Sequence, residues 1–333
     1  MREARTGGHD TFRPRGAKAL RTAGVTAVLI AVLGGCAART AVPGPPPSGV
    51  PTPPAATPVS RLHLPIEVYL LPPAVSAVYD RVRGGLIHDC MHAFGLAYPA
   101  PPRTAPTPDE LAAYTVTYRR YGITDPASVR VWGYRVPRPA HPATDPAAGV
   151  RLADLTPAAR RVLLGVDPGT GAVVTREGGR TVPSHGCVGD ADRRLGGGDT
   201  TSPQGPQSGP GGLVATIKQD SFQASRTDPR VTRVFTAWSA CMRAAGYHVT
   251  DPLRAAAGLP APRDGHPGHA EIAQATADVT CKTRTDLVGV WFAVESDYQN
   301  TAIHAHAAAL DRVRADLDRE AAALRELAPR YTG

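Results

Sequence analysis

A Cys-Met pair at the end of an amphipathic run occurs twice in this chain and constrains its fold more than any other feature. CMHAFG (90–95) and CMRAAG (241–246) share Cys, Met, Ala and Gly in register. The runs before them place apolar residues at the i, i+3, i+4, i+7 positions of one helix face. Each cysteine is therefore expected on a buried stripe, in about the last turn of its helix.

Flanking residues predict where these and other helices begin and end. Gly95 and Gly246 stand where helices favour a glycine just beyond the C-terminus, and Asp228-Pro229 supplies an N-cap and a first-turn proline. Further short helices are expected at three polar-residue–proline pairs: Thr107-Pro108, Asp125-Pro126 and Thr156-Pro157.

The N-terminal segment predicts export. Residues 1–21 carry six basic and two acidic side chains, and the short apolar run after them ends at Cys36. That run falls short of the roughly 20 apolar residues of a membrane span, so residues 1–35 are expected to be a signal peptide. Leu33-Gly34-Gly35-Cys36 resembles the bacterial lipobox, whose cysteine receives a diacylglyceryl thioether. An ordinary signal peptide with a chance cysteine is the alternative.

A proline-rich segment follows the lipobox. Residues 41–60 contain eight prolines and no charged side chain, a composition that favours extended polyproline II. Twenty such residues reach about 60 Å. We therefore expect a lipidated stalk over 36–60 and a folded extracytoplasmic domain over 61–330, with halves 61–196 and 213–330 joined by a Gly/Pro-rich loop.

Net charge disfavours nucleic acid as a partner. The whole chain has 37 basic and 29 acidic residues, and removing the residues before Cys36 lowers the net charge from +8 to +4. No basic run or aromatic-basic interleaving accompanies this small excess.

Cysteine count and order suggest two disulfides. Four cysteines remain after Cys36, in a compartment where disulfides persist. Sequence alone leaves three pairings open. Because each Cys-Met helix is followed by one further cysteine, the simplest prediction pairs Cys90 with Cys187 and Cys241 with Cys281.

The remaining pattern is helical. From about Gly268 to Ala328 the chain is expected to be helix, with a heptad stripe that packs along another helix of this domain or of a partner. Strand character is confined to short pieces such as 172–175 and 68–71. The predicted fold is mainly α: a disulfide-stapled helical domain with a long C-terminal helix and little or no sheet. The heptad residues are Ile303, Leu310, Leu317 and Leu324.

Several of these features together resemble a group of actinobacterial (Streptomyces-like) lipoproteins. They are the lipobox, the stalk, the two Cys-Met helices, GCVGDADRRL (186–195) and the stretch from DVTCKTRTD to ESDYQ (278–299). The resemblance implies a lipid-anchored domain on the extracytoplasmic face of the cell membrane. It implies no activity.

VPSHGCVGD (182–190) admits a catalytic alternative. Ser-His-Gly-Cys resembles the nucleophile motif of L,D-transpeptidases, in which a histidine activates the thiolate. That family's base histidine lies about 15 to 20 residues before the cysteine, and here that interval has none. Gly189 also replaces the usual Arg or Asn. We therefore predict a structural Cys187 and no catalytic residues, with Cys187 and His185 as the pair that an enzyme would use.

Histidine pairs raise the question of a metal. His88 and His92 share one helix face at i and i+4, but no acid completes HExxH and Cys90 is expected to be oxidised. No metal or other cofactor is therefore predicted. The other histidines are expected to be solvated or to lie in the core: His266, His269, His304 and His306. The acids Asp286, Glu295 and Asp297 are expected to be solvated on a helical surface.

The sequence thus favours a non-enzymatic envelope protein, held at the membrane by a lipid on Cys36, that binds or assembles with a protein or cell-wall component. A cysteine-dependent cell-wall enzyme is the alternative. A solute-binding lipoprotein would need alternating strands and helices, a pattern that this chain lacks.

Overall fold

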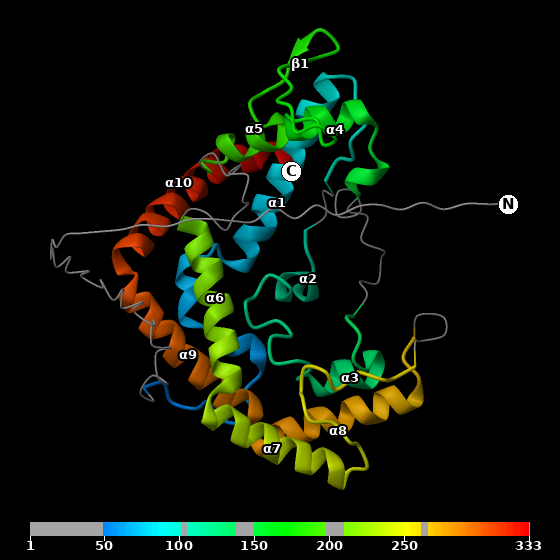
Figure 1. Ribbon diagram of the computed structural model, residues 1–333, viewed down its shortest axis with the longest axis vertical. Coiled ribbons are helices and arrows are strands. Elements are labelled where there is room, and N and C mark those ends of the chain that lie inside the picture. The colour runs from blue at the N-terminus through cyan, green and yellow to red at the C-terminus, as the bar shows by residue number, and fades with distance from the viewer. Residues whose placement is uncertain (1–48, 102–104, 138–149, 198–209, 261–265, 333) are drawn as a thin grey trace, which may run out of the picture. The chain divides into compact units, whose positions relative to one another are not determined.

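The computed structural model describes residues 49–101, 105–137, 150–197, 210–260 and 266–332. The predicted signal peptide, Cys36 and the first part of the predicted stalk lie outside these ranges. Within them the fold is mainly helical (Figure 1), which confirms the predicted fold class. No helix in the described ranges is long and apolar enough to cross a membrane.

Six helices longer than 15 residues contain most of the helical residues. They are α1 (Pro73–Ala93), α6 (Pro210–Thr227), α7 (Pro229–Ala244), α8 (His269–Thr285), α9 (Leu287–Ala305) and α10 (Ala307–Tyr331). The shorter ones are α2 (Pro108–Ala112), α3 (Pro126–Trp132), α4 (Pro157–Leu164), α5 (Gly186–Arg194) and the 3-10 helices η1 (Val59–Arg61), η2 (Pro65–Tyr69) and η3 (Leu152–Asp154).

Strand structure is smaller than expected and partly elsewhere. β1 (Arg176–Glu177) pairs with β2 (Arg180–Thr181) in an antiparallel hairpin. Of the predicted strand 172–175, only Val173 pairs, in an isolated bridge with Val166. The prediction for 68–71 is wrong, because this stretch overlaps the end of η2, whose Ile66 and Tyr69 are buried in the core.

The predicted helix starts are confirmed. Thr107 and Glu110 form a reciprocal capping box at α2. The side chains of Asp125, Thr156 and Asp228 accept backbone N–H bonds at the starts of α3, α4 and α7. These bonds satisfy amides that a helix leaves without intrahelical partners.

Both Cys-Met helices end in the same turn. After α1, Gly95 is left-handed (φ 70°), its N–H donates to the His92 carbonyl, and the Leu96 N–H donates to the Met91 carbonyl. After α7, Gly246 (φ 91°) and Tyr247 donate to Arg243 and Met242 in the same way. This is the Schellman motif, and it explains why Gly recurs four residues after Met.

Two large hydrophobic clusters form most of the interior of the described residues, and a small third one joins α3 to α8 through Val129, Ala275 and Val279. The main core gathers side chains from η2, the segment between α2 and α3, α6, α7, α8, α9 and the first half of α10. They include Leu64, Ile66, Tyr121, Trp238, Met242, Leu287, Trp291 and Leu310. The second core gathers side chains from α1, α4, α5 and the end of α10, including Val82, Leu86, Met91, Val162, Cys187, Leu195 and Leu324.

The C-terminal helical region is broken twice. Asp286 is left-handed (φ 52°) between α8 and α9, and His306 caps α9 before α10 begins. The heptad stripe is therefore divided, because Leu310 packs in the main core while Leu324 packs in the second core. α10 thus joins the two cores instead of lying along a single partner helix.

The two halves, 61–196 and 213–330, pack against each other in both hydrophobic cores. Leu64 and Ile66, from the first half, lie in the main core with α9. The end of α10, from the second half, packs on α1, where the Tyr331 ring leaves no room for a Cβ at Gly85. Each core therefore contains side chains from both halves.

Candidate functional site

The first Cys-Met helix is joined to α5 by the Cys90–Cys187 disulfide, as predicted. Its Cα atoms lie 5.7 Å apart, and Cys187 is fully buried. His185 and Gly186 are both left-handed at the start of α5, where a Cβ on Gly186 would lie 2.5 Å from the Gly165 nitrogen. The glycine of Ser-His-Gly-Cys thus lets α5 approach the end of α4. The sulfur of Cys187 is bonded to Cys90 and is not a thiolate.

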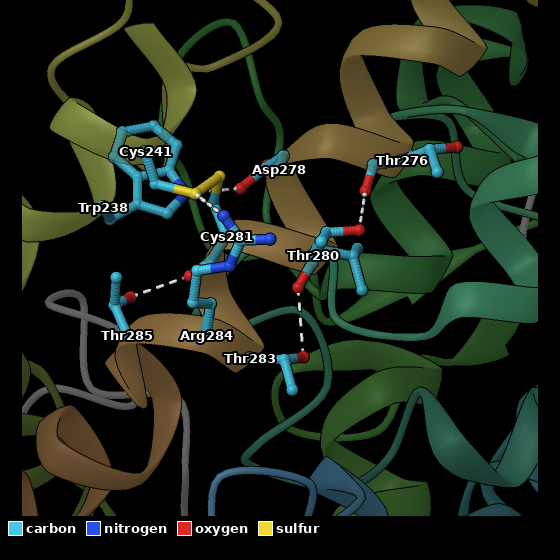
Figure 2. Close-up of a disulfide and its surroundings, with 10 residues drawn as sticks. Trp238, Cys241, Thr276, Asp278, Thr280, Cys281, Thr283, Arg284 and Thr285 are labelled. Carbon is cyan, nitrogen blue, oxygen red and sulfur yellow. Dashed lines mark hydrogen bonds between the residues drawn. A yellow bond between two sulfur atoms is a disulfide. The ribbon is translucent and has the colours of Figure 1, made fainter. Parts of the chain in front are cut away.

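The second disulfide, Cys241–Cys281, joins α7 to α8, also as predicted (Figure 2), and its Cα atoms are again 5.7 Å apart. One helical turn before each cysteine stands a member of a buried polar pair. Trp238 Nε1 donates to Asp278 Oδ1 over 2.9 Å. The two helices are therefore held by a hydrogen bond as well as by the disulfide.

Asp278 also pairs with Lys282 in the interior. Lys282 Nζ lies 3.2 Å from Asp278 Oδ2 and donates to the Ile123 carbonyl over 3.0 Å. Burial raises the pKa of Asp278 and lowers the pKa of Lys282, in each case against the attraction between the two groups. With both side chains at most 2% exposed, the arrangement is a structural link between α8 and the segment before α3.

Glu295 was expected to be solvated, and that prediction is wrong. Its carboxylate is fully buried in α9 and accepts hydrogen bonds from Arg120 Nε (2.8 Å) and Tyr121 Oη (2.9 Å). Burial raises the pKa of Glu295, although the Arg120 bonds act in the opposite direction. Gln299, one turn later, donates to the same carboxylate and accepts the Ile66 N–H, which fastens η2 to α9.

Asp297 was also expected to be solvated and is instead 4% exposed. Its Oδ1 accepts the backbone N–H groups of Gly49 and Val50, each over 3.0 Å. Its Oδ2 accepts Arg230 Nη1 over 2.9 Å. The proline-rich segment that was expected to stand free as a stalk therefore lies against the helical body at residues 49–53, which we call the strap.

Two further features of the helical body support the contact with the strap: the position of Arg230 and the glycine at 289. Arg230 is held toward Asp297 by paired bonds to Asp228, both 3.0 Å long. Burial alone would raise the pKa of Asp228, but the Arg230 bonds hold it below its ordinary value. On α9, a Cβ at Gly289 would lie 2.8 Å from the Pro53 carbonyl oxygen. A glycine at this position therefore lets the strap approach the helix.

A groove of about 320 Å³ opens beside the strap. Val50 and Thr52 of the strap form one wall, and α7 and α9 form the rest. The helix residues that line it are Arg230, Arg233, Val234, Val290, Ala293, Val294 and Asp297. We take the strap and this groove as the candidate functional site, because here the segment that leads to Cys36 meets the folded body.

A second groove, of about 390 Å³, runs between α3 and α8. Three threonines of α8 line it, but each hydroxyl donates to the carbonyl four residues earlier, so their donors are already used. Arg130 and Arg284 stand at this groove on exposed positions.

The histidine pairs differ in geometry. The rings of His88 and His92 stack, with centroids 6.1 Å apart. His266, His269, His304 and His306 are exposed. In the described ranges no three His, Cys, Asp or Glu side chains gather in the manner of a metal site.

The chain matches no protein-family model, no curated protein and no solved structure.

Proposed function

We propose that this protein is a lipid-anchored module on the extracytoplasmic face of the cell membrane, which binds or assembles with a protein or cell-wall component of the envelope. In this proposal Cys36 carries the lipid, and the helical body is the part displayed.

The strap is the observation that carries the proposal. Asp297 fixes Gly49 and Val50 to α9, so the segment that leads to Cys36 meets the body at one defined place. Gly49 stands thirteen residues after Cys36. At roughly 3.5 Å per residue, those residues reach about 45 Å at most. A strap of this kind would limit how far and in which orientation the body stands from the lipid.

The two disulfides support an exported location. Cys90–Cys187 and Cys241–Cys281 both have ordinary Cα separations, and disulfides persist mainly in oxidising compartments. The bond to Cys90 also argues against the alternative of a cell-wall transpeptidase, which would need the thiolate of Cys187.

Cell fractionation with a Cys36→Ser variant tests the proposal. The parent protein is expected in the membrane fraction and in the detergent phase of a detergent partition, while the Cys36→Ser variant is expected in the aqueous phase. Asp297→Asn is the matched control, because it weakens the strap and leaves the lipidation site intact. A parent protein found in the cytosol with all five cysteines reduced would contradict the proposal. A Cys36→Ser variant that partitions like the parent would contradict it as well.

A further inference from the structure

The last two turns of α1 carry two histidines on one face. His88 and His92 are four residues apart, and their ring planes are inclined by only 27°. His88 is half-buried and His92 is exposed. Residues at i and i+4 are neighbours on a helix surface, and the two ring centroids lie 6.1 Å apart.

A backbone contact fixes the orientation of His88. Its Nδ1 lies 2.7 Å from the carbonyl oxygen of Tyr98. A carbonyl oxygen can only accept, so Nδ1 donates this bond, and in the neutral ring the lone pair is therefore on Nε2. Histidines that ligate metals are oriented in this way, with the second ring nitrogen donating to a carbonyl or carboxylate.

The turn after α1 creates that contact. The left-handed Gly95 reverses the chain in the Schellman motif, and three residues later the Tyr98 carbonyl lies beside His88. The same Cys-Met helix end that buries Met91 therefore also holds a histidine with a free Nε2. From the sequence, no metal was expected here, because no acid completes HExxH and Cys90 was expected to be oxidised. The Tyr98 contact, which orients His88, has no sequence pattern.

We propose that His88 and His92 form a two-imidazole site for a divalent first-row transition metal ion. Imidazole pairs suit Cu²⁺, Ni²⁺ and Zn²⁺, and Cu²⁺ is expected to bind most tightly of the three. Water, or a donor from another molecule, completes the coordination. The site does not involve Cys36, and His92 is exposed to solvent. Cys90, between the two histidines, is bonded to Cys187 and is therefore not a ligand.

Titration of the full-length, untagged protein in detergent with Cu²⁺ tests this inference, by calorimetry and by electron paramagnetic resonance. The parent is expected to bind one Cu²⁺ at this site with two nitrogen ligands in the resonance spectrum. His92→Ala and His88→Ala are each expected to weaken binding at least about tenfold, since even the loss of an outer-shell partner costs roughly 10–100-fold. His92→Ala changes an exposed side chain, so its fold can be verified by its melting temperature.

The matched control is His304→Ala/His306→Ala. These histidines are also exposed and close in sequence, but they straddle the end of α9. The control is expected to leave the affinity for Cu²⁺ unchanged. Three results would overturn the proposal: no Cu²⁺ binding by the parent, equal affinity in His92→Ala, or a comparable loss in the control.

Discussion

The two disulfides join helices by the same local device, but the surroundings of the two bonds differ. In each, a buried Met follows the cysteine and a left-handed glycine ends the helix, and the Cα atoms are 5.7 Å apart. Around Cys241–Cys281 two long helices also share the Trp238–Asp278 hydrogen bond. Around Cys90–Cys187 the partner is α5, a helix of nine residues that follows a small hairpin.

The two cores that contain these disulfides also differ in how they are packed. The Trp291 ring in the main core contacts the rings of Tyr121, Phe222 and Phe235 at centroid distances of 5.0 to 5.3 Å. The fully buried members of the second core are aliphatic side chains, Met91 and Cys187. A disulfide can therefore reinforce a well-packed helix pair or replace packing that short elements cannot supply. We infer that Cys90–Cys187 does the latter.

Removal of each disulfide gives the largest expected effect and tests this inference. The disulfide removed in Cys90→Ala/Cys187→Ala joins residues that are 97 apart in the sequence. The one removed in Cys241→Ala/Cys281→Ala joins residues that are 40 apart. Loop-closure entropy alone predicts losses of about 4.7 and about 3.9 kcal/mol in the free energy of unfolding. Urea titration measures both. Equal losses, or a larger loss for the second pair, would break the comparison.

The buried pair in α8 gives the next largest effect. Lys282→Met leaves Asp278 charged without its partner in the interior, and we expect a loss of about 3–5 kcal/mol in the free energy of unfolding. Asp278→Leu/Lys282→Met is expected to recover most of it. Arg151→Ala is the control, because its ion pair with Asp154 is exposed and contributes at most about 1 kcal/mol. If Lys282→Met were as stable as Arg151→Ala, the buried Asp278–Lys282 pair would not have the stabilising role assigned to it.

Alanine substitution is expected to have opposite effects on stability at two helix glycines, because Gly289 lies beside the strap and Gly84 does not. Gly289→Ala brings a Cβ against the Asp286 carboxylate and against the Pro53 carbonyl, and is expected to cost about 1–3 kcal/mol. Because Pro53 belongs to the strap, hydrogen exchange at Gly49 and Val50 is expected to become faster. Gly84→Ala in α1 meets only an ordinary contact, 3.4 Å from Pro101, and is expected to be stabilising by up to about 1 kcal/mol. Unchanged exchange at the strap in Gly289→Ala would show that the strap does not depend on this approach.

Acid unfolding gives the smallest predicted effect. The pKa of Asp228 is lower in the folded state than in the unfolded chain, so its contribution is fully present above about pH 4 and is lost as the pH falls through the folded-state pKa. Asp228→Asn keeps an N-cap residue and is expected to cost about 1 kcal/mol at neutral pH. The difference between variant and parent should shrink as the pH drops below 4. A difference that is constant with pH would contradict the assignment.

Local signals predicted much of this fold. The N-caps at Thr107, Asp125, Thr156 and Asp228, the glycines that end α1 and α7, and the two disulfides all follow from residues close together or from cysteine order. The capping signals each lie within one helix turn, and the disulfide pairing follows from the order of the four cysteines along the chain.

The errors concern contacts between distant residues. Glu295 and Asp297 looked like solvated helix charges because their partners Arg120 and Gly49 lie 175 and 248 residues away. The breaks at Asp286 and His306 carry no Gly or Pro. They let α10 run from the main core, where it packs with α9, to the second core. The strap was missed because proline-rich composition predicts extension but not what an extended segment lies against.

Non-reducing peptide mapping of the protein extracted from membranes tests the central claim most directly, that this is an exported, lipid-anchored and doubly disulfide-bonded module. The account predicts linked peptides for Cys90–Cys187 and Cys241–Cys281, together with an N-terminal peptide that carries a lipid on Cys36. A Cys187 that reacts with an alkylating reagent before reduction, in a protein with an unmodified Cys36, would contradict it.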